Sequence, residues 1–271
     1  MDAAAILARA RRDPRRGIST IAMADLADLG AGPLDALACG VTPAPWVRSA
    51  HSIDGAAQER LARARVAVVG AGGLGGYVIE LLARMGVGFL RVVDGDAFEE
   101  TNMNRQLLAE PATLGRSKAQ VAQERLARIA PWCVVDARAV FVDAGNAAAL
   151  LGGVDVVLDC LGGVDARLVV HAACAAASVP VVAAAVAGWT VVVGSQLPGK
   201  PGISLLWADP SAADAEGQLG SLAPAVAMAA SLQAAEAVQY LTTSRLELAG
   251  KVLHADLGTW AFSIYHMSED E

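Results

Sequence analysis

A polar segment, DGDAFEETNMNRQ at 94–106, holds the side chains with the most evident chemistry in this sequence. It follows directly on the apolar run FLRVV, a short way after the glycine-rich stretch GAGGLGG at 70–76. An acid at the end of an apolar strand, behind a glycine-rich turn, is typical of a site that binds the ribose of a nucleotide. Asp94 has that place. The amides and the arginine that follow it need a separate explanation, because ribose binding does not use them.

The glycine-rich stretch indicates where a phosphate would bind. Glycines permit a tight turn between a strand and a helix, and they let a phosphate approach the backbone N–H groups at the helix N-terminus. Such a turn fits NAD, FAD or ATP. Taken with Asp94 alone, it favours an oxidoreductase.

Positive charge beside the turn changes that interpretation. Asn102, Asn104, Arg105 and Gln106 follow the acid closely, and Lys118 lies near the start of the next expected helix. Arginine and lysine suit a triphosphate, because they neutralise β- and γ-oxygens or a pyrophosphate leaving group. A nicotinamide cofactor carries only a bridged pyrophosphate. The cluster therefore favours nucleotide activation over redox chemistry, although each charge taken singly is also typical of an exposed surface.

The elements that must position these groups alternate along the chain. Apolar runs predict strands at 66–70, 89–94, 134–142, 154–160 and 180–186. Helical spacing of apolar residues predicts helices at 75–86, 117–131, about 144–151 and 165–177. Two strands, a long alanine-rich helix at about 222–243 and the final strands KVLHAD and WAFSIYHM follow Gly188. This order predicts an α/β fold: a Rossmann-like, mainly parallel sheet with helices on both faces, continuing into a mixed or antiparallel C-terminal part.

The chain divides into a short first part and one large domain. Residues 1–57 combine a short helix with turns that contain glycine and proline, so we expect a partly helical N-terminal extension. Residues 58–271 are expected to form the large domain, with a nucleotide-binding half at about 58–187 and a substrate-binding half at about 188–271.

Composition limits the partners and the compartment. The chain is 55% hydrophobic and 18% charged, and its net charge of −7 without a basic block argues against nucleic acid. The stretch between Arg167 and Lys200 lacks charge, but Pro180 and Gly188 interrupt it, so we expect a buried core and no membrane span. Four cysteines lie far apart without a CxxC pair and no secretory signal begins the chain, which predicts a reducing, cytoplasmic location and no zinc site built on paired cysteines.

From about Gln58 onward the chain resembles the adenylating enzymes that activate ubiquitin-like proteins, in their bacterial ThiF/MoeB/HesA form. The matching segments are QERLARARVAVVGAGGLGG, GVGFLRVVDGDAFEETNMNRQLL, LGRSKAQVAQERLARIAP, DVVLDC and GSLAPAVAMAASLQAAEAVQYL. The resemblance implies an adenylyltransferase that uses ATP and Mg²⁺ and activates the C-terminal carboxylate of a small ubiquitin-like sulfur-carrier protein of the ThiS/MoaD type. Pyrophosphate is then released, and the enzyme is expected to be a homodimer.

The same resemblance implies roles for individual residues. Arg105 and Lys118 would act on the triphosphate, and Arg48 would reach across the dimer to the γ-phosphate. The residues expected to contact the nucleotide are Gly70, Gly72, Gly73, Gly75, Asp94, Asp96, Asn102, Asn104, Arg105, Gln106, Lys118, Cys160, Leu161 and Gly162.

The metal-binding motif departs from the family pattern. Asp159 matches its first aspartate, but Gly162 and Gly163 stand where the family has an aspartate and an asparagine. Glycine offers no ligand to Mg²⁺, which prefers carboxylate and water oxygens. We therefore expect Asp165 to serve as a catalytic metal ligand, unless it is only the N-cap of the next helix. Three alternatives stay open: Asp96 binds the Mg²⁺, ATP and water alone hold the ion, or adenylation is impaired.

Two further departures concern zinc and sulfur. The family's zinc cysteines are replaced by WADPSAAD at 207–214, and no cysteine is placed for a thioester step. Cys174 is expected in the core, and Cys160 ends a buried strand beside the site. Besides the sulfur-carrier adenylyltransferase, three functions stay open: adenylation of a small carboxylic acid, NAD-dependent oxidation, and a catalytically silent nucleotide-binding homologue.

Overall fold

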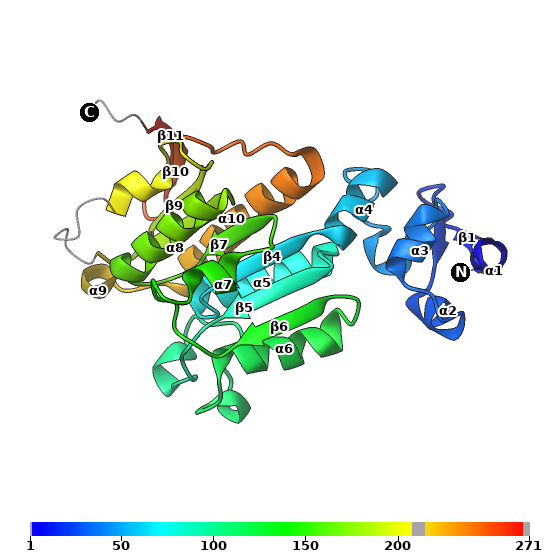
Figure 1. The fold of residues 1–271 in the computed structure, drawn as a ribbon, viewed down its shortest axis with the longest axis horizontal. Helices are drawn as coiled ribbons and strands as arrows, with labels where there is room; N and C mark the ends of the chain where they lie inside the picture. Colours follow the sequence, from blue (N-terminus) through cyan, green and yellow to red (C-terminus); the bar gives the residue numbers. More distant parts are fainter. Residues whose placement is uncertain (1, 208–214, 268–271) are drawn as a thin grey trace.

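The computed structural model describes residues 2–207 and 215–267. Within these residues, eight strands form one sheet with helices on both faces, and a small three-stranded sheet lies near the N-terminus (Figure 1). The order of the large sheet is β11 (Ala261–His266), β10 (Lys251–Asp256), β9 (Thr190–Gln196), β8 (Val181–Ala187), β7 (Val156–Asp159), β4 (Arg65–Val69), β5 (Phe89–Val93) and β6 (Val134–Arg138). Strands β8, β7, β4, β5 and β6 run parallel, and β8 to β11 pair antiparallel. The predicted fold class is confirmed.

Alternating side chains of the central strands explain why both faces carry helices. Val66 and Val68 of β4 are fully buried against α5 (Gly73–Met85), α6 (Lys118–Ile129) and α10 (Ala223–Thr243). Ala67 and Val69 point to the opposite face, against α7 (Ala147–Leu151) and α8 (Val164–Ala177). A strand buried on both faces is apolar at successive positions, which accounts for the run VAVV.

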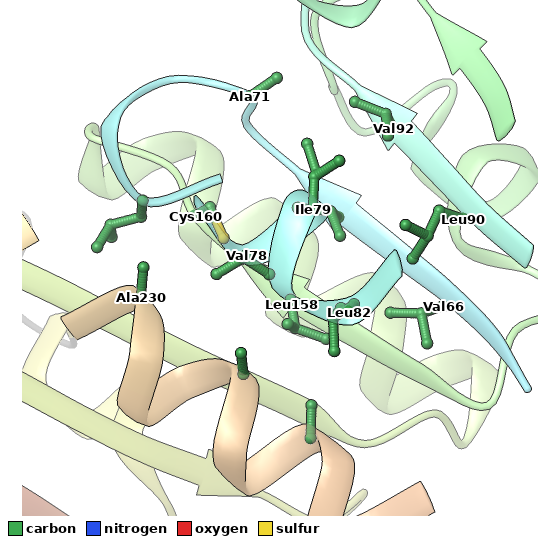
Figure 2. Packing of buried hydrophobic residues seen from close by; sticks show 14 of the residues in the cluster. Val66, Ala71, Val78, Ile79, Leu82, Leu90, Val92, Leu158, Cys160 and Ala230 are labelled. Carbon is green, nitrogen blue, oxygen red and sulfur yellow. The ribbon is translucent and has the colours of Figure 1, made fainter. Parts of the chain in front are cut away.

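Helix α10 packs against α5 and the sheet through small side chains. Figure 2 shows Ala230 of α10 beside the cluster that contains Val78 and Leu82 of α5. Alanines let the backbones of two helices approach closely, so α10 packs small side chains against the larger Val78 and Leu82 of α5. The long alanine-rich stretch is therefore a core element, and within the described residues no helix is long and apolar enough to cross a membrane.

The order of the strands creates a crevice. Strand β4 leads through α5 to β5 on one side, while β7, reached later in the chain, pairs with its other side. The connections that leave the carboxyl ends of β4 and β7 thus lead in opposite directions, to β5 and to β8. In open α/β sheets, ligands bind outside the carboxyl ends of the strands at such a switch point.

The N-terminal part has its own small core. It contains α1 (Ala3–Arg9), α2 (Met23–Asp28), α3 (Pro33–Ala38) and a sheet of β1 (Arg11–Arg12), β2 (Ser19–Ile21) and β3 (Thr42–Pro43). Buried side chains of this part form a separate cluster that includes Ile6, Ile21, Leu26 and Val41. Helix α4 (Gly55–Arg63) then leads into β4 (Figure 1). The short strands were not predicted, and the boundary at residue 57 stays a prediction.

Two strand predictions were wrong in extent or type. Strand β6 ends at Arg138 instead of 142, because its partner β5 ends at Val93, which pairs with Arg138 and leaves later residues nothing to pair with. Of the two strands expected between Gly188 and the alanine-rich helix, the described residues form only β9, and the apolar run that follows is the 3₁₀ helix η4 (Ile203–Trp207). Pro198 and Pro201 lack the N–H groups that a strand needs.

The segment before α10 is partly helical. Residues 208–214, with Asp209, Asp214 and most of the segment WADPSAAD, lie outside the described residues. The residues that follow, 215–221, contain the short helix α9 (Ala215–Leu219).

Candidate nucleotide-binding site

A cavity of about 280 Å³ opens at the carboxyl ends of β4, β5 and β7. It lies at the switch point described above, and polar and charged side chains from several loops line it. Of the residues expected to contact a nucleotide, the cavity brings together Gly70, Gly72, Gly73, Asp94, Asp96, Arg105, Gln106, Lys118, Cys160, Leu161 and Gly162.

The glycine turn places backbone N–H groups at the cavity. Gly70 has φ +93°, and a Cβ there would lie 2.6 Å from the carbonyl oxygen of Cys160. Helix α5 begins at Gly73 with Gly72 as its N-cap, and no side chain of the described residues caps it. Its first N–H groups can therefore bind a phosphate. Gly75 does not line the cavity; a Cβ there would lie 1.8 Å from the carbonyl oxygen of Gly70, so this glycine permits contact of helix and strand.

Asp94 is held in place by the backbone. Its carboxylate accepts hydrogen bonds from the N–H of Ala71 at 2.7 Å and from the N–H of Asp96 at 2.8 Å. Burial raises the pKa of Asp94 above its ordinary value, and it outweighs these N–H groups and the charge of Lys118. The residue lines the cavity at the end of β5, where a ribose would bind.

The two cations keep unused donors. Lys118 is only 7% exposed, and its Nζ lies 3.2 Å from Oδ2 of the half-exposed Asp96. Arg105 donates through Nη1 to the Thr101 carbonyl at 3.0 Å and to Oδ1 of Asn104 at 2.9 Å. A guanidinium has five N–H donors and an ammonium has three, so both side chains retain donors for a phosphate.

Gln106 indicates that the cavity takes a ligand. The side chain is buried and lines the cavity, yet its Oε1 has no hydrogen-bond partner among the described residues. A buried polar atom without a partner costs free energy, which a bound donor would recover. The two asparagines of the segment do not line the cavity: Asn102 accepts from the N–H of Glu99 at 3.1 Å, and Asn104 is exposed.

Asp159 is used by the fold. The side chain is fully buried, and its Oδ2 lies 2.9 Å from Nη1 of Arg167 and 3.1 Å from Nε2 of His171. Its Oδ1 accepts from the N–H of Leu161 at 3.1 Å. Burial alone would raise the pKa of Asp159, but Arg167 and His171 outweigh it and hold the pKa below its ordinary value. Arg167 also donates to the carbonyls of Leu161 and Ala184. Asp159, Arg167 and His171, here the Asp159 cluster, thus fix the turn at 160–162.

The remaining expected residues lie apart from the cavity. Asp165 is exposed in the first turn of α8 and does not line it; the N-cap is Gly163, so the capping alternative for Asp165 was wrong. Arg48 is exposed two residues after Trp46, whose Nε1 donates to the Arg84 carbonyl near the amino end of β5. Arg48 is therefore distant from the cavity of its own chain. The metal role of Asp165 and the cross-dimer role of Arg48 stay predictions.

The cysteines are poor nucleophiles in this structure. Burial raises the pKa of Cys160, and its Sγ lies 3.4 Å from Oε1 of Gln233. Burial also raises the pKa of Cys133 and of Cys174 to about 12. A thiolate is the reactive form, so none of the three is prepared for attack at neutral pH.

Sequence reasoning missed part of the cavity wall. Val140, Phe141 and Val142 line it because β6 ends early, and Glu216 and Ser221 enter from α9 and the residues after it. Gly95 was a signal that some group approaches the backbone closely, since a Cβ there would lie 2.6 Å from the Phe141 ring, but it did not indicate which residue. A lone glutamate in the segment AEGQL gave no such signal.

A protein-family model described as the ThiF family matches residues 47–271. The chain belongs to the ThiF family. Among curated relatives, the molybdopterin-synthase adenylyltransferase of Escherichia coli K12 is 34% identical over 210 residues, 76% of this chain and 84% of that protein. The vegetative HesA protein of Trichormus variabilis is 34% identical over 208 residues, 76% of this chain and 78% of its own. The resemblance drawn from the motifs is confirmed, and the chain is a ThiF-family adenylyltransferase.

Solved structures agree on the fold. The crystal structure of E. coli MccB aligns with a TM-score of 0.73 at 22% identity, over 83% of this ThiF-family chain and 70% of that one. At such identity the match supports the architecture alone.

Proposed function

We propose that this chain uses ATP to adenylate the C-terminal carboxylate of a small ubiquitin-like sulfur-carrier protein of the ThiS/MoaD type. The observation that carries the proposal is the cavity itself, where Arg105 and Lys118 keep unused donors beside the free N-terminus of α5. Relatives support the substrate class: besides the molybdopterin-synthase enzyme, a sulfur carrier protein adenylyltransferase of Thermus thermophilus is 40% identical over 129 residues, 48% of each chain.

The residues around the cavity suggest how ATP is held. Asp94 would accept hydrogen bonds from the ribose, and the N–H groups at Gly72 and Gly73 would bind phosphate. A carboxylate oxygen of the carrier attacks the α-phosphorus, an acyl-adenylate forms, and the bond to the β-phosphate oxygen breaks. Arg105 and Lys118 would stabilise the charge that develops on the departing pyrophosphate.

A magnesium ion fits this donor set. Asp94, Asp96 and Glu216 are the acidic residues that line the cavity, and the described residues hold no group of three or more His, Cys, Asp or Glu placed as a metal site. Mg²⁺ usually binds through one or two carboxylates together with substrate phosphates and water. When bound, it would neutralise charge on the pyrophosphate.

ATP–pyrophosphate exchange with recombinant carriers tests the proposal. We expect exchange that depends on an intact carrier and is absent with the same carrier shortened by its C-terminal glycine. Exchange supported by a small carboxylic acid instead, or no exchange with any substrate although ATP binds, would contradict the carrier assignment. Tighter binding of NAD than of ATP would contradict the nucleotide assignment.

The homodimer and the role of Arg48 belong to the same proposal. Because Arg48 lies away from the cavity of its own chain, it would have to act on the nucleotide of a second subunit. Mixing Arg48→Ala chains with Lys118→Ala chains tests this, since mixed dimers would regain one complete site. No recovery of exchange on mixing would exclude that role.

A further inference from the structure

Glu216 places a carboxylate at the cavity from an element whose role the sequence did not reveal. It lies in α9, and its Oε1 accepts a hydrogen bond from Oγ of Ser221 at 2.7 Å. Its Oε2 lies 3.5 Å from the position that a Cβ on Gly162 would occupy. Both Ser221 and Gly162 also line the cavity. One oxygen is therefore fixed by Ser221, and the other is directed at the space that Gly162 leaves open.

The other carboxylates near the cavity are wholly or partly engaged by protein groups, or lie apart from the cavity. Both oxygens of Asp94 accept backbone N–H groups, and Oδ2 of Asp96 pairs with Lys118. Asp159 is buried within its cluster, and Asp165 lies outside the cavity wall. Among the described residues, Oε2 of Glu216 has no hydrogen-bond or ion-pair partner.

Backbone conformation does not require glycine at 162. Gly162 has no positive φ, unlike Gly70, and a Cβ there would make only an ordinary van der Waals contact. The missing side chain therefore leaves room beside a carboxylate that reaches in from α9. In the same cavity, the unpartnered and buried Oε1 of Gln106 indicates independently that a ligand belongs there.

We propose that Glu216 supplies the protein carboxylate for the Mg²⁺ that accompanies ATP, in the space left by the glycine at 162. This inference rests on the proposed function, because it presumes that ATP fills the cavity. Ser221 would orient Glu216 through its hydrogen bond to Oε1, so that Oε2 faces the metal. The role thus falls to a residue distant in sequence from the segment at 159–163.

Nucleotide affinity with and without metal tests this assignment without relying on turnover. Calorimetry measures ATP binding in EDTA and in excess Mg²⁺, for the unchanged protein, for Glu216→Gln and for Asp165→Asn, which removes the competing candidate ligand. We expect Mg²⁺ to strengthen ATP binding by the unchanged protein and by Asp165→Asn. Glu216→Gln should lose about tenfold or more of that gain, the order of loss for altered metal sites, while its affinity in EDTA stays the same.

A direct metal signal and a rescue complete the test. Paramagnetic resonance of Mn²⁺ with ATP should show weaker metal binding in Glu216→Gln, and adding Gly162→Asp should restore it, since this returns a carboxylate to the same space. Failure of the unchanged protein to bind ATP would overturn the proposed function and the inference with it. Binding that gains from Mg²⁺ equally in Glu216→Gln, or loses that gain in Asp165→Asn, would overturn the inference alone.

Discussion

Two groups of charges lie on either side of the turn at 160–162, and they differ in how completely they are paired. In the Asp159 cluster, both oxygens of Asp159 have partners, and Arg167 donates to Asp159 and to two carbonyls. On the cavity side, Lys118 has one partner at 3.2 Å and Arg105 uses Nη1 alone. Charges that are fully paired hold the turn, and charges with unused donors are available to a ligand.

The difference has an energetic basis. A buried ion pair gains little net stability, but removal of one partner leaves an uncompensated charge and is strongly destabilising. Lys118 is buried too, but Asp96 is half exposed, so water can solvate Asp96 if the pair is broken. We therefore expect substitutions in the Asp159 cluster to affect folding and substitutions at the cavity to affect binding.

Arg167→Leu should have the largest effect. It would leave Asp159 charged and buried, at a cost of about 3–5 kcal/mol in the free energy of unfolding. Denaturant unfolding measures this, with the exposed Arg128→Leu as control, expected within about 0.5 kcal/mol of the unchanged protein. A loss at Arg167 no larger than at Arg128 would show that the Asp159 cluster does not stabilise the fold.

The pH dependence of that loss checks its cause. In the unchanged protein the pKa of Asp159 is held below its unfolded value, so its contribution is present above about pH 4 and is lost as the pH falls through the folded pKa. In Arg167→Leu, Asp159 would keep only His171 and the N–H of Leu161 as partners, so burial would raise that pKa. The variant should therefore be destabilised at neutral pH, and this destabilisation should decrease as Asp159 takes up a proton. The difference in stability should narrow as the pH falls toward about 4; a difference independent of pH would point to lost packing against Trp207 instead.

Lys118→Ala and Arg105→Ala should lower activity with little effect on stability, the reverse of what we expect for Arg167→Leu. Each is expected to lower pyrophosphate exchange by roughly 100- to 1,000-fold, the effect of removing one group that stabilises transition-state charge. Stability should fall by no more than about 1 kcal/mol, because their partners are exposed or are backbone groups. Exchange rates and thermal unfolding of the same preparations measure both. A variant that unfolds readily but keeps its turnover when folded would make that residue structural.

Gln106→Leu should give the smallest effect, and stability and ATP affinity should respond differently. Replacement of a buried oxygen that has no partner should leave the free protein as stable or slightly more so. ATP affinity should fall by about 0.5–1.5 kcal/mol, the net value of one hydrogen bond. Calorimetry measures the ATP affinity, and thermal unfolding measures the stability. Lost stability with unchanged affinity would show that Gln106 serves the fold.

The sequence predicted the parts of the molecule that depend on local pattern. Apolar runs and helical spacing indicated the order of elements, and the turn at Gly70 with the acid at Asp94 indicated the phosphate and ribose ends of the cavity. These signals work because backbone geometry at a strand–turn–helix junction restricts residue types locally. No such local pattern showed that Lys118 keeps donors for a ligand while Arg167 is fully paired, since both are single cations in apolar or amphipathic helices.

Features set by distant contacts could not be predicted. The end of β6 depends on where β5 ends, and the approach of Glu216 to Gly162 joins segments that are far apart in the sequence. The 159–163 segment indicated that a ligand was missing but not which residue replaces it. The sequence alone favours Asp165, the acid that follows Gly162 most closely, whereas the structure places Glu216 at the cavity and Asp165 outside its wall.

Binding of ATP and AMP by the unchanged protein and by Lys118→Ala tests most directly whether the charges on the cavity side serve a triphosphate. The two nucleotides share the base, the ribose and the α-phosphate, so Asp94 and the glycine turn should treat them alike. We predict that Lys118→Ala weakens ATP binding by about tenfold or more, equal to about 1.4 kcal/mol, and leaves AMP binding nearly unchanged. An equal loss for both nucleotides, or none for either, would contradict the account.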